Sequence, residues 1–390
     1  MSNTPLDEAI PFNRPFITGK ETEYVEKAIQ NGRLAGDGHF TGLCSSWLEE
    51  ACHSRKILLT HSCTGALEMS AVLADFGPGD EVLVPSFTFV STANAIAVRG
   101  AKPVFVDIRP DTLNIDEKLL EEQITPRTKG IVVVHYAGIS CEMDEIIQIA
   151  KKYNLFLIED AAQGVMCRYK NRFLGTLGHL GCFSFHETKN IGCGDGGALS
   201  INEAGLELRA EIIRDKGTDR AKFLRGELRK YSWIDIGSSY HMGELKSSFL
   251  WAQLLEAKEI YRQRLRVWDA YHEAFAEFEK LGVLRRPVVP GYCEHGGHLY
   301  YLLLTSPMTR DKFIRHMTKH RIQCVFHYLP LHKSPYWESS LVGSSSANRE
   351  LPVSEAVGDT LVRLPIWIGI DHSRVIEQAT GFFCGADRTS

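Results

Sequence analysis

Seven short β-rich segments alternate with helical patterns between residues 56 and 201. Several of these segments are apolar throughout, as expected for strands that are covered on both faces. The expected strands are Lys56–Thr60, Glu81–Val84, Pro103–Asp107, Gly130–Val134, Leu155–Ile158, Cys182–Phe185 and Gly197–Ile201. Helical patterns such as Gly65–Ala74 and Met143–Lys151 lie between them. This alternation predicts an α/β domain with a mostly parallel seven-stranded sheet and helices on both faces.

The pattern changes after about Ser238. Residues 244–281 predict one long amphipathic helix with apolar residues on its inward face. The expected inward residues are Leu250, Leu254, Leu265, Trp268, Phe275 and Phe278. Beyond this helix we expect strands over Tyr300–Leu304 and Gln323–Tyr328, a helix over Arg310–His320 between them, and a loop over Val342–Asn348. We therefore expect a large domain over residues 1–245, and a connecting helix with a smaller α+β domain over residues 246–390.

Charge and composition exclude several classes of partner. The formal net charge of -4 gives no reason to expect nucleic acid or an anionic membrane. No stretch is long and apolar enough to span a bilayer. The ten cysteines lack metal-ligand spacing, so we expect reduced thiols and no metal site. The first ten residues carry neither a basic region nor an apolar run, so we expect no signal peptide and a cytoplasmic protein.

A carboxylate and a lysine follow two successive strands of the large domain. Asp160 comes directly after Leu155–Ile158 and Glu159, and Lys189 follows Cys182–Phe185. A pyridoxal phosphate (PLP) site needs a lysine that bonds to the cofactor and a carboxylate that keeps the pyridine nitrogen protonated. A buried carboxylate is costly without a partner, and a pyridinium N–H would supply a charge-assisted hydrogen bond. On its own Lys189 would be read as a surface lysine, so the hypothesis depends on further residues.

A phosphate group could bind where a helix begins after the first strand. Thr64 and Gly65 are small, and a helix N-terminus offers N–H groups to an anion. A simple helix N-cap in this segment is the alternative. Ser184, which points opposite to Phe183 and Phe185, could also contact the phosphate.

Other residues could contact the ring of the cofactor. Phe89 could stack on a flat ring, or it could be a core phenylalanine. Gln163 could hold the ring hydroxyl, and His186 is either a general base or a structural histidine. No Gly-x-Gly-x-x-Gly follows the first strand, which argues against an NAD enzyme, and Gly192–Gly197 predicts a turn.

Together these segments resemble the DegT/DnrJ/EryC1/StrS family of sugar aminotransferases. The resemblance extends from about Ile10 to Pro365, and it rests on Ser62–Ala66, Pro85–Phe89, Val134–Gly138, Glu159–Gln163 and Ser184–Lys189 in this order. It implies the PLP-dependent transferase fold of type I, like that of aspartate aminotransferase, with PLP as the cofactor. The matching residues imply that Lys189 bonds to the cofactor and Asp160 contacts the pyridine nitrogen. They also imply that Gln163 lies beside the ring hydroxyl and that Phe89 stacks on the ring. The phosphate would be surrounded by Thr64, Gly65 and Ser184.

The resemblance also implies a homodimer in which each active site borrows residues from the other subunit. Ser239 and His241 stand where many relatives have an asparagine and an arginine. Ser239 is the residue predicted to reach the partner's phosphate. Asp195 stands where a glutamate is commoner.

A closer likeness to one branch of the family implies the substrates. These are dTDP-4-dehydro-6-deoxy-D-glucose and L-glutamate, and the products are dTDP-4-amino-4,6-dideoxy-D-galactose and 2-oxoglutarate. The C4 epimer, a C3 amine and a catalytically idle regulator with a PLP fold remain alternatives. Deoxygenating relatives carry a histidine in place of the lysine, so Lys189 argues against deoxygenation.

Overall fold

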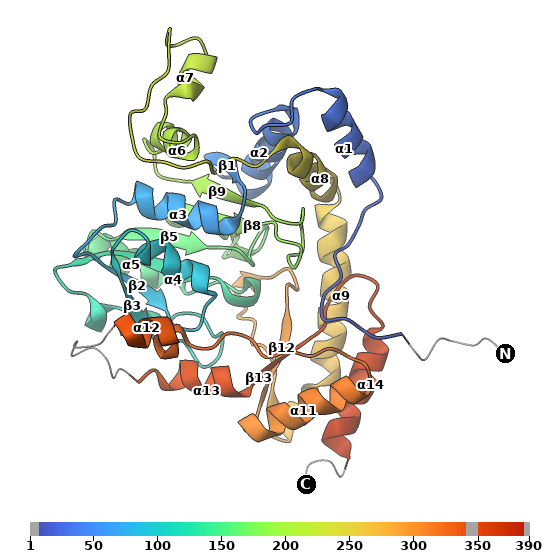
Figure 1. Cartoon of the computed structure of the whole chain (residues 1–390). Coiled ribbons are helices and arrows are strands. Elements are labelled where there is room, and N and C mark those ends of the chain that lie inside the picture. Colours follow the sequence, from blue (N-terminus) through green and yellow to red (C-terminus); the bar gives the residue numbers. More distant parts are fainter. Residues whose placement is uncertain (1–7, 341–349, 386–390) are drawn as a thin grey trace.

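Residues 56–201 contain the strands of one seven-stranded sheet (Figure 1). The computed structural model describes residues 8–340 and 350–385. The strands are β1 Lys56–Thr60, β2 Glu81–Pro85, β3 Lys102–Val106, β4 Thr128–Val134, β5 Phe156–Asp160, β8 Leu180–Ser184 and β9 Gly197–Ile201, in the order β1-β9-β8-β5-β4-β2-β3. Strand β9 is antiparallel to both its neighbours, and the other neighbouring pairs are parallel. The predicted mostly parallel sheet is confirmed.

Helices cover both faces of this sheet. Alternate residues of β1 enter different cores: Ile57 and Leu59 pack in a cluster with Leu48, and Leu58 packs in another with Leu67. The first cluster includes residues of α2 His39–Cys52, α5 Met143–Lys152 and α8 Glu244–Leu255. The second includes residues of α3 Cys63–Leu73, α4 Val90–Ala97 and α6 Glu207–Arg214. Burial on both faces explains why the strands are apolar throughout.

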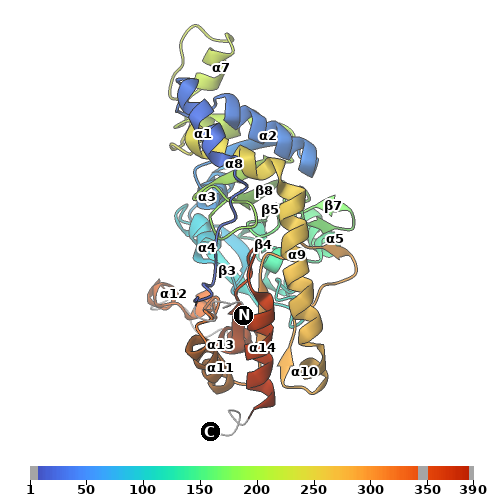
Figure 2. The same ribbon diagram turned by 90° about the vertical axis from the view of Figure 1, so that its right-hand side faces the viewer.

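The helix predicted over residues 244–281 is wrong as a single element. The structure has three helices there, α8 Glu244–Leu255, α9 Ala257–Ala274 and α10 Ala276–Lys280. The backbone leaves helical geometry at Glu256 (φ -102°, ψ 11°) and Phe275 (φ -93°, ψ 3°). The reason is tertiary: Leu250 and Leu254 pack in the core of the large sheet, whereas Trp268 and Phe275 pack under the second sheet. Figures 1 and 2 show α9 running from one sheet to the other.

Two of the six expected inward residues in this stretch are only partly buried. They are Leu265 and Phe278. The break at Glu256 and the change of packing partner shift the buried face of α9 to Ala257, Ile260, Arg264, Val267, Trp268 and Tyr271.

A smaller antiparallel sheet lies in the C-terminal part of the chain. Its strands are β10 Leu284–Arg285, β12 Tyr300–Leu304 and β13 Leu361–Leu364, in the order β10-β12-β13. Helices α11 Pro307–Lys319 and α14 His372–Cys384 pack on it with α9. The strand expected at Tyr300–Leu304 and the helix expected at Arg310–His320 are confirmed. The division of the chain at residue 245 stays a prediction.

The strand predicted over Gln323–Tyr328 is wrong. This segment makes one isolated bridge, between Val325 and Arg363, and Ile322 just before it makes another with Ile10. Its aromatic and β-branched residues mimic a strand, but His327 and Tyr328 stack on each other instead of alternating across a sheet, with ring centroids 3.6 Å apart. The loop predicted over Val342–Asn348 lies outside the described residues.

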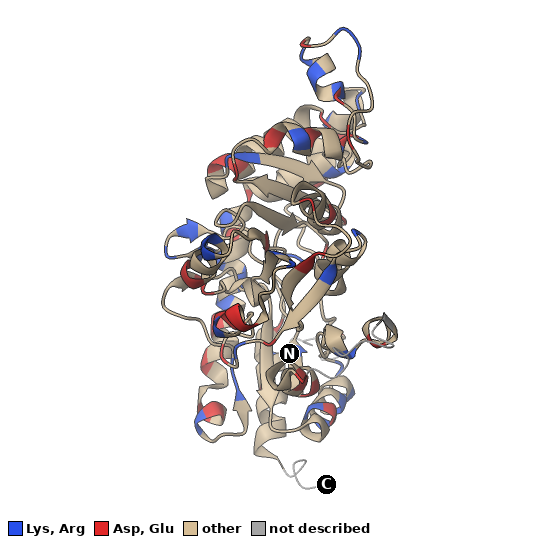
Figure 3. Cartoon of the chain, turned by 90° about the vertical axis from the view of Figure 1, so that its left-hand side faces the viewer, with Lys and Arg blue, Asp and Glu red and all other residues tan. Residues whose placement is uncertain are grey.

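The remaining elements are short. They are α1 Glu21–Gln30, β6 Arg168–Tyr169, β7 Arg172–Phe173, α7 Arg220–Leu224, β11 Cys293–Glu294, α12 Pro335–Ser340 and α13 Pro352–Thr360. Within residues 8–340 and 350–385, no helix is long and apolar enough to cross a membrane. Basic and acidic residues are interspersed over both halves of the ribbon (Figure 3). All ten cysteines are free thiols.

Candidate active site

The predicted site residues follow the carboxyl ends of strands that point the same way. Strands β1, β2, β4, β5 and β8 all run in one direction, so their carboxyl ends lie along one edge of the sheet. Thr64, Phe89, Asp160, Ser184 and Lys189 all come at or soon after such ends. This is the edge at which open parallel sheets bind ligands.

Asp160 is the last residue of β5 and is held in a fixed position. Its side chain is buried, with the residue only 5% exposed. Thr92 donates a hydrogen bond to Oδ2 (2.8 Å), and the Ala162 backbone N–H donates to Oδ1 (3.2 Å). Burial raises the pKa of Asp160, although these hydrogen bonds oppose the shift. A buried carboxylate of this kind fits the protonated ring nitrogen of PLP, which would supply the missing positive charge.

The neighbouring Glu159 has a different role. Successive side chains of a strand point to opposite faces, so Glu159 points away from Asp160. Its carboxylate is fully buried, lies 2.8 Å from His135 Nε2, and accepts hydrogen bonds from the backbone N–H groups of Gly175, Leu177 and Gly178 (2.6–2.8 Å). Glu159 therefore anchors the loop before β8.

Lys189 lies in the loop between β8 and β9, and its backbone N–H donates to the carbonyl of His186 (2.9 Å). The next residue, Asn190, donates from Nδ2 to the carbonyl of Gly296 (2.7 Å), which ties this loop to the segment before β12. Burial lowers the pKa of Lys189, against the opposing charges of Cys63 and Asp160. Lys189 also borders a cavity of about 240 Å³ beside Gln253, which none of the other predicted site residues lines. A lowered pKa leaves more free amine at neutral pH, as a nucleophilic lysine requires.

His186 is exposed near Lys189. Its Nδ1 lies 2.9 Å from Thr188 Oγ1, and its Nε2 lies 3.8 Å from Asp195. These contacts fit a structural histidine, and the general-base role stays a prediction. The turn predicted over Gly192–Gly197 is present, with Gly194 at φ +83°.

The first turn of α3 meets the end of β8 at Gly197. This glycine pairs with both Thr60 and Ser184. A Cβ on Gly197 would lie 2.4 Å from the backbone N of Cys63, so only glycine lets β9 lie against this turn. The start of α3 and Ser184 are thereby placed at one end of the sheet.

The alternative prediction for this segment, a simple helix N-cap, is confirmed for Ser62. Its Oγ accepts a hydrogen bond from the backbone N–H of Gly65 (3.1 Å). Thr64 is partly exposed with its Oγ1 2.9 Å from Ser91 Oγ, and Ser184 Oγ accepts a bond from His186 N (3.4 Å). A helix start leaves several N–H groups without an intrahelical partner, and the cap satisfies one of them. The cap and a phosphate site are therefore compatible.

Phe89 and Gln163 lie beside Tyr328. The ring of Phe89 is not in the core, since the residue is 56% exposed. Its centroid lies 6.3 Å from that of Tyr328. Gln163 is buried; its Oε1 accepts from the Ala137 N–H (2.7 Å), and its Nε2 donates to Tyr328 Oη (3.1 Å). Phe89 thus offers an open aromatic face, and the side-chain amide of Gln163 is held in a fixed position.

Ser239 lies on an exposed segment, and its backbone forms a bridge with Asp215. Nearby His241 lies between two carboxylates, with Nδ1 3.5 Å from Asp37 and Nε2 3.6 Å from Asp215. The predicted role of Ser239 requires a second subunit and stays a prediction.

Sequence reasoning missed several residues of the site. Thr92 fixes Asp160 from α4, and Tyr136 Oη lies 2.7 Å from His327 Nδ1. Burial raises the pKa of Tyr136 and lowers the pKa of His327 well below its usual range, so the phenol is protonated and the imidazole is neutral. These residues come from segments far apart in sequence. The clustering of aromatic and histidine residues in 325–332 was the one available signal.

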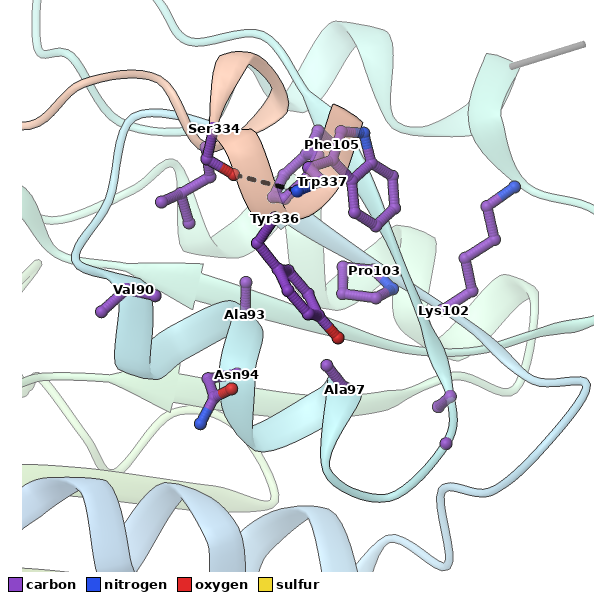
Figure 4. Close-up of a pocket in the computed structure, with 13 residues that line it drawn as sticks. Val90, Ala93, Asn94, Ala97, Lys102, Pro103, Phe105, Ser334, Tyr336 and Trp337 are labelled. Carbon is purple, nitrogen blue, oxygen red and sulfur yellow. Dashed lines mark hydrogen bonds between the residues drawn. The ribbon is translucent and has the colours of Figure 1, made fainter. Parts of the chain in front are cut away.

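A separate groove of about 410 Å³ lies on another side of α4 (Figure 4). Val90, Ala93 and Ala97 line it from α4, with Tyr336 and Trp337 opposite. Thr92, which bonds to Asp160, is not among its lining residues, and neither is any predicted site residue. The groove is therefore distinct from the site at the sheet edge.

A comparison with known proteins identifies the family. The model of the DegT/DnrJ/EryC1/StrS aminotransferase family matches residues 15–379. The chain belongs to this family. It is therefore a PLP-dependent sugar aminotransferase with the fold of type I, as the sequence predicted.

Individual relatives of this family member cover nearly the whole chain. GDP-perosamine synthase of Caulobacter vibrioides is 32% identical, over 93% of this chain and 95% of that protein. Spore coat polysaccharide biosynthesis protein SpsC of Bacillus subtilis is 31% identical, over 97% of this chain and 98% of that protein. The Streptococcus pneumoniae protein Spr1654 in its PLP-form has a TM-score of 0.86 and 26% identity, covering 95% of this chain and 98% of that one.

Proposed function

We propose that this family member moves the amino group of L-glutamate to C4 of dTDP-4-dehydro-6-deoxy-D-glucose. The products are dTDP-4-amino-4,6-dideoxy-D-galactose and 2-oxoglutarate. The observation that carries the amination is Lys189, whose pKa is lowered by burial. It lies in the loop after β8, and β8 pairs with β5, the strand that ends in the buried carboxylate of Asp160. The choice of sugar is supported by Pro85–Asn94, Phe183–Asn190 and Val325–His332, which resemble the transaminase of enterobacterial common antigen synthesis that makes this product.

PLP supplies an electron sink for the carbon that gains or loses the amino group. Asp160 would accept the ring N–H and keep that nitrogen protonated. Lys189 Nζ would remove the α-proton of glutamate and later deliver a proton to C4 of the sugar. The face of the sugar that Lys189 reaches decides whether the new amine is axial or equatorial.

The remaining residues would hold and orient the cofactor. Thr64, Gly65 and Ser184 would bind the phosphate at the start of α3, where helix N–H groups favour an anion. Phe89 would stack on the ring through its exposed face, and Gln163 would lie beside the ring hydroxyl.

The proposed active unit is a homodimer in which Ser239 of the partner subunit completes the phosphate site. Support comes from the segment just before Ser239, which exposes apolar side chains. Trp233 is 77% exposed, and Tyr231, Ile234 and Ile236 are also exposed. Exposed apolar patches of this kind mark interaction surfaces.

A second candidate is amination of a different nucleotide sugar. The identity to a protein named GDP-perosamine synthase supports a nucleotide sugar but leaves the base open. The C4 epimer and a C3 amine also remain candidates.

The deciding experiment is NMR of the product made from glutamate and dTDP-4-dehydro-6-deoxy-D-glucose. The proposed product has an axial amine, so the coupling between H3 and H4 should be small. A large coupling would indicate the gluco epimer. A parallel incubation with the GDP-linked ketosugar tests the base, and equal or faster turnover of that substrate would contradict the dTDP assignment.

A further inference from the structure

His332 joins the segment that carries Tyr328 to the end of β2. It is buried, and its Nδ1 lies 2.6 Å from the Oγ of Ser86, the residue just after β2. Its backbone N–H donates to the same Oγ (3.3 Å), and the N–H of Leu331 donates to the carbonyl of Ser86 (2.9 Å). Side-chain and backbone bonds therefore hold this segment against the strand end.

Glu355 of α13 orients the imidazole ring of His332. Its Oε1 lies 3.0 Å from Nε2, and the hydrogen bond from His332 lowers the pKa of Glu355. An ionised carboxylate only accepts hydrogen bonds, so Nε2 carries the ring hydrogen. Nδ1 of the neutral ring then accepts the hydroxyl hydrogen of Ser86. Both ring nitrogens are thus used, one toward β2 and one toward α13.

Helix α13 is itself fixed to the neighbouring strand. Asp107, the residue just after β3, accepts hydrogen bonds from the backbone N–H groups of Val353 (3.0 Å) and Ser354 (2.8 Å) at the start of α13. Strands β2 and β3 pair with each other in the seven-stranded sheet. Both partners of the His332 ring are therefore attached to the same rigid sheet.

Two predicted cofactor contacts lie on either side of this junction. Ser86 leads along the chain to Phe89, and His332 follows closely after Tyr328. The ring centroid of Tyr328 lies 6.3 Å from that of Phe89, and its Oη accepts a hydrogen bond from Gln163 Nε2 (3.1 Å). The contacts between Ser86 and His332 therefore constrain how Tyr328 lies relative to both groups.

The side-chain amide of Gln163 is oriented by its two neighbours. Its Oε1 accepts from the N–H of Ala137 (2.7 Å), which directs Nε2 toward Tyr328. An amide nitrogen has two hydrogens to donate, and the bond to Tyr328 uses one of them. The other can be donated to the ring hydroxyl oxygen of PLP, in the role proposed for Gln163. Tyr328 therefore fixes the direction of that second donor.

We propose that His332 is a positioning residue for the cofactor ring. It acts through Tyr328, which orients the donor of Gln163 and limits the movement of Phe89. This inference rests on the proposed function, which places Gln163 and Phe89 on the ring. Without the imidazole, β2 and α13 lose their shared partner, and the segment that carries Tyr328 is free to shift.

The test measures PLP affinity and the absorbance of bound PLP in His332→Ala and His332→Asn. His332→Ala should weaken PLP binding about tenfold, the effect of about one lost buried hydrogen bond. It should also raise the pH at which the absorbance of bound PLP changes, because a hydrogen bond donated to the ring oxygen favours its deprotonated form. His332→Asn can keep an acceptor near the position of Nδ1 and should recover part of both losses.

Lys333→Gln is the matched control. Lys333 is the next residue in the chain, and its Nζ lies 3.4 Å from the same oxygen of Glu355, but its side chain is half exposed. This variant should change neither the PLP affinity nor the pH of the absorbance change.

A double-mutant cycle separates positioning from a general loss of stability. Gln163→Leu removes the amide donor, so adding His332→Ala to it should not raise the pH of the absorbance change any further. If His332→Ala does not fold, His332→Gln takes its place in the cycle, since it can keep the bond to Glu355 but not the bond to Ser86.

Three results would overturn the inference. They are additive effects of the two substitutions, an unchanged pH of the absorbance change in His332→Ala, and wild-type absorbance in Gln163→Leu. None of these measurements uses the sugar nucleotide. If the wild-type enzyme does not aminate the proposed sugar, the substrate assignment fails, and the measurements on bound PLP still decide the role of His332.

Discussion

Asp160 is buried and Lys189 is partly buried, and this burial moves the pKa of each toward the value that favours its neutral form. For Lys189 this favours the free amine that attacks and moves protons. For Asp160, burial makes the ionised carboxylate unfavourable without a positively charged partner. The protonated ring nitrogen of PLP would be such a partner. The same physical cause thus prepares both residues for one cofactor.

Replacing Lys189 with alanine should leave the cofactor able to bind but reduce turnover by about 10²–10⁴-fold or more, because proton transfer by a placed base is lost. The measurement is amino-sugar formation at saturating glutamate. Lys118→Ala, an exposed lysine in the same domain, should keep wild-type turnover. Turnover by Lys189→Ala at the wild-type rate would contradict the assignment.

Asp160→Asn should stabilise the cofactor-free protein while abolishing turnover. The pKa of Asp160 is raised in the folded state, so ionising it opposes folding, and stability falls as pH rises above the ordinary value of about 3.9 and through the raised value. The asparagine carries no such charge. The advantage of the variant in Tm should therefore grow with pH, as thermal unfolding at several pH values would show. A constant difference in Tm across pH would refute this account.

At the scale of elements, the strands and their ends could be predicted from local sequence. Asp160 and Lys189 each stand just after an apolar run, so the topology of a parallel sheet places them at one edge. The break at Glu256 could not be predicted, because no proline or glycine marks it and only packing against two different sheets explains it. Thr92 was missed for a related reason: its contact with Asp160 joins segments far apart in the chain.

Gly197 controls how β9 and α3 meet, so Gly197→Ala should weaken cofactor binding. The added Cβ would collide with the backbone of Cys63 and Ser62 and should destabilise the fold by about 1–3 kcal/mol. Titration with PLP and denaturant unfolding measure the two effects. Gly42→Ala on α2, where a Cβ meets nothing within 4 Å, is the control and should be neutral or slightly stabilising. Unchanged PLP affinity in Gly197→Ala would contradict the role given to this contact.

At the scale of the whole molecule, the proposed homodimer makes each site depend on two chains. The solution mass should then be twice the 43.8 kDa of one chain. Ser239→Asp should weaken PLP binding, since it would place a carboxylate against the phosphate of the partner's site.

Mixed dimers test the sharing of residues directly. A dimer of one Lys189→Ala chain and one Ser239→Asp chain has one site with both residues intact. At a PLP concentration too low to load the Ser239→Asp variant, co-expression of the two variants should therefore give more activity than either variant alone. Failure to restore activity in isolated mixed dimers would show that Ser239 does not serve the partner's site.

The central claim is that Lys189 is the lysine that carries the cofactor. Reduction of the PLP-loaded enzyme with borohydride would fix the cofactor on that lysine, and mass spectrometry of the digested protein would locate it. We predict the modification on the peptide that contains Lys189, and its loss when glutamate is added before reduction. Modification of a different lysine, or none at Lys189, would contradict the account.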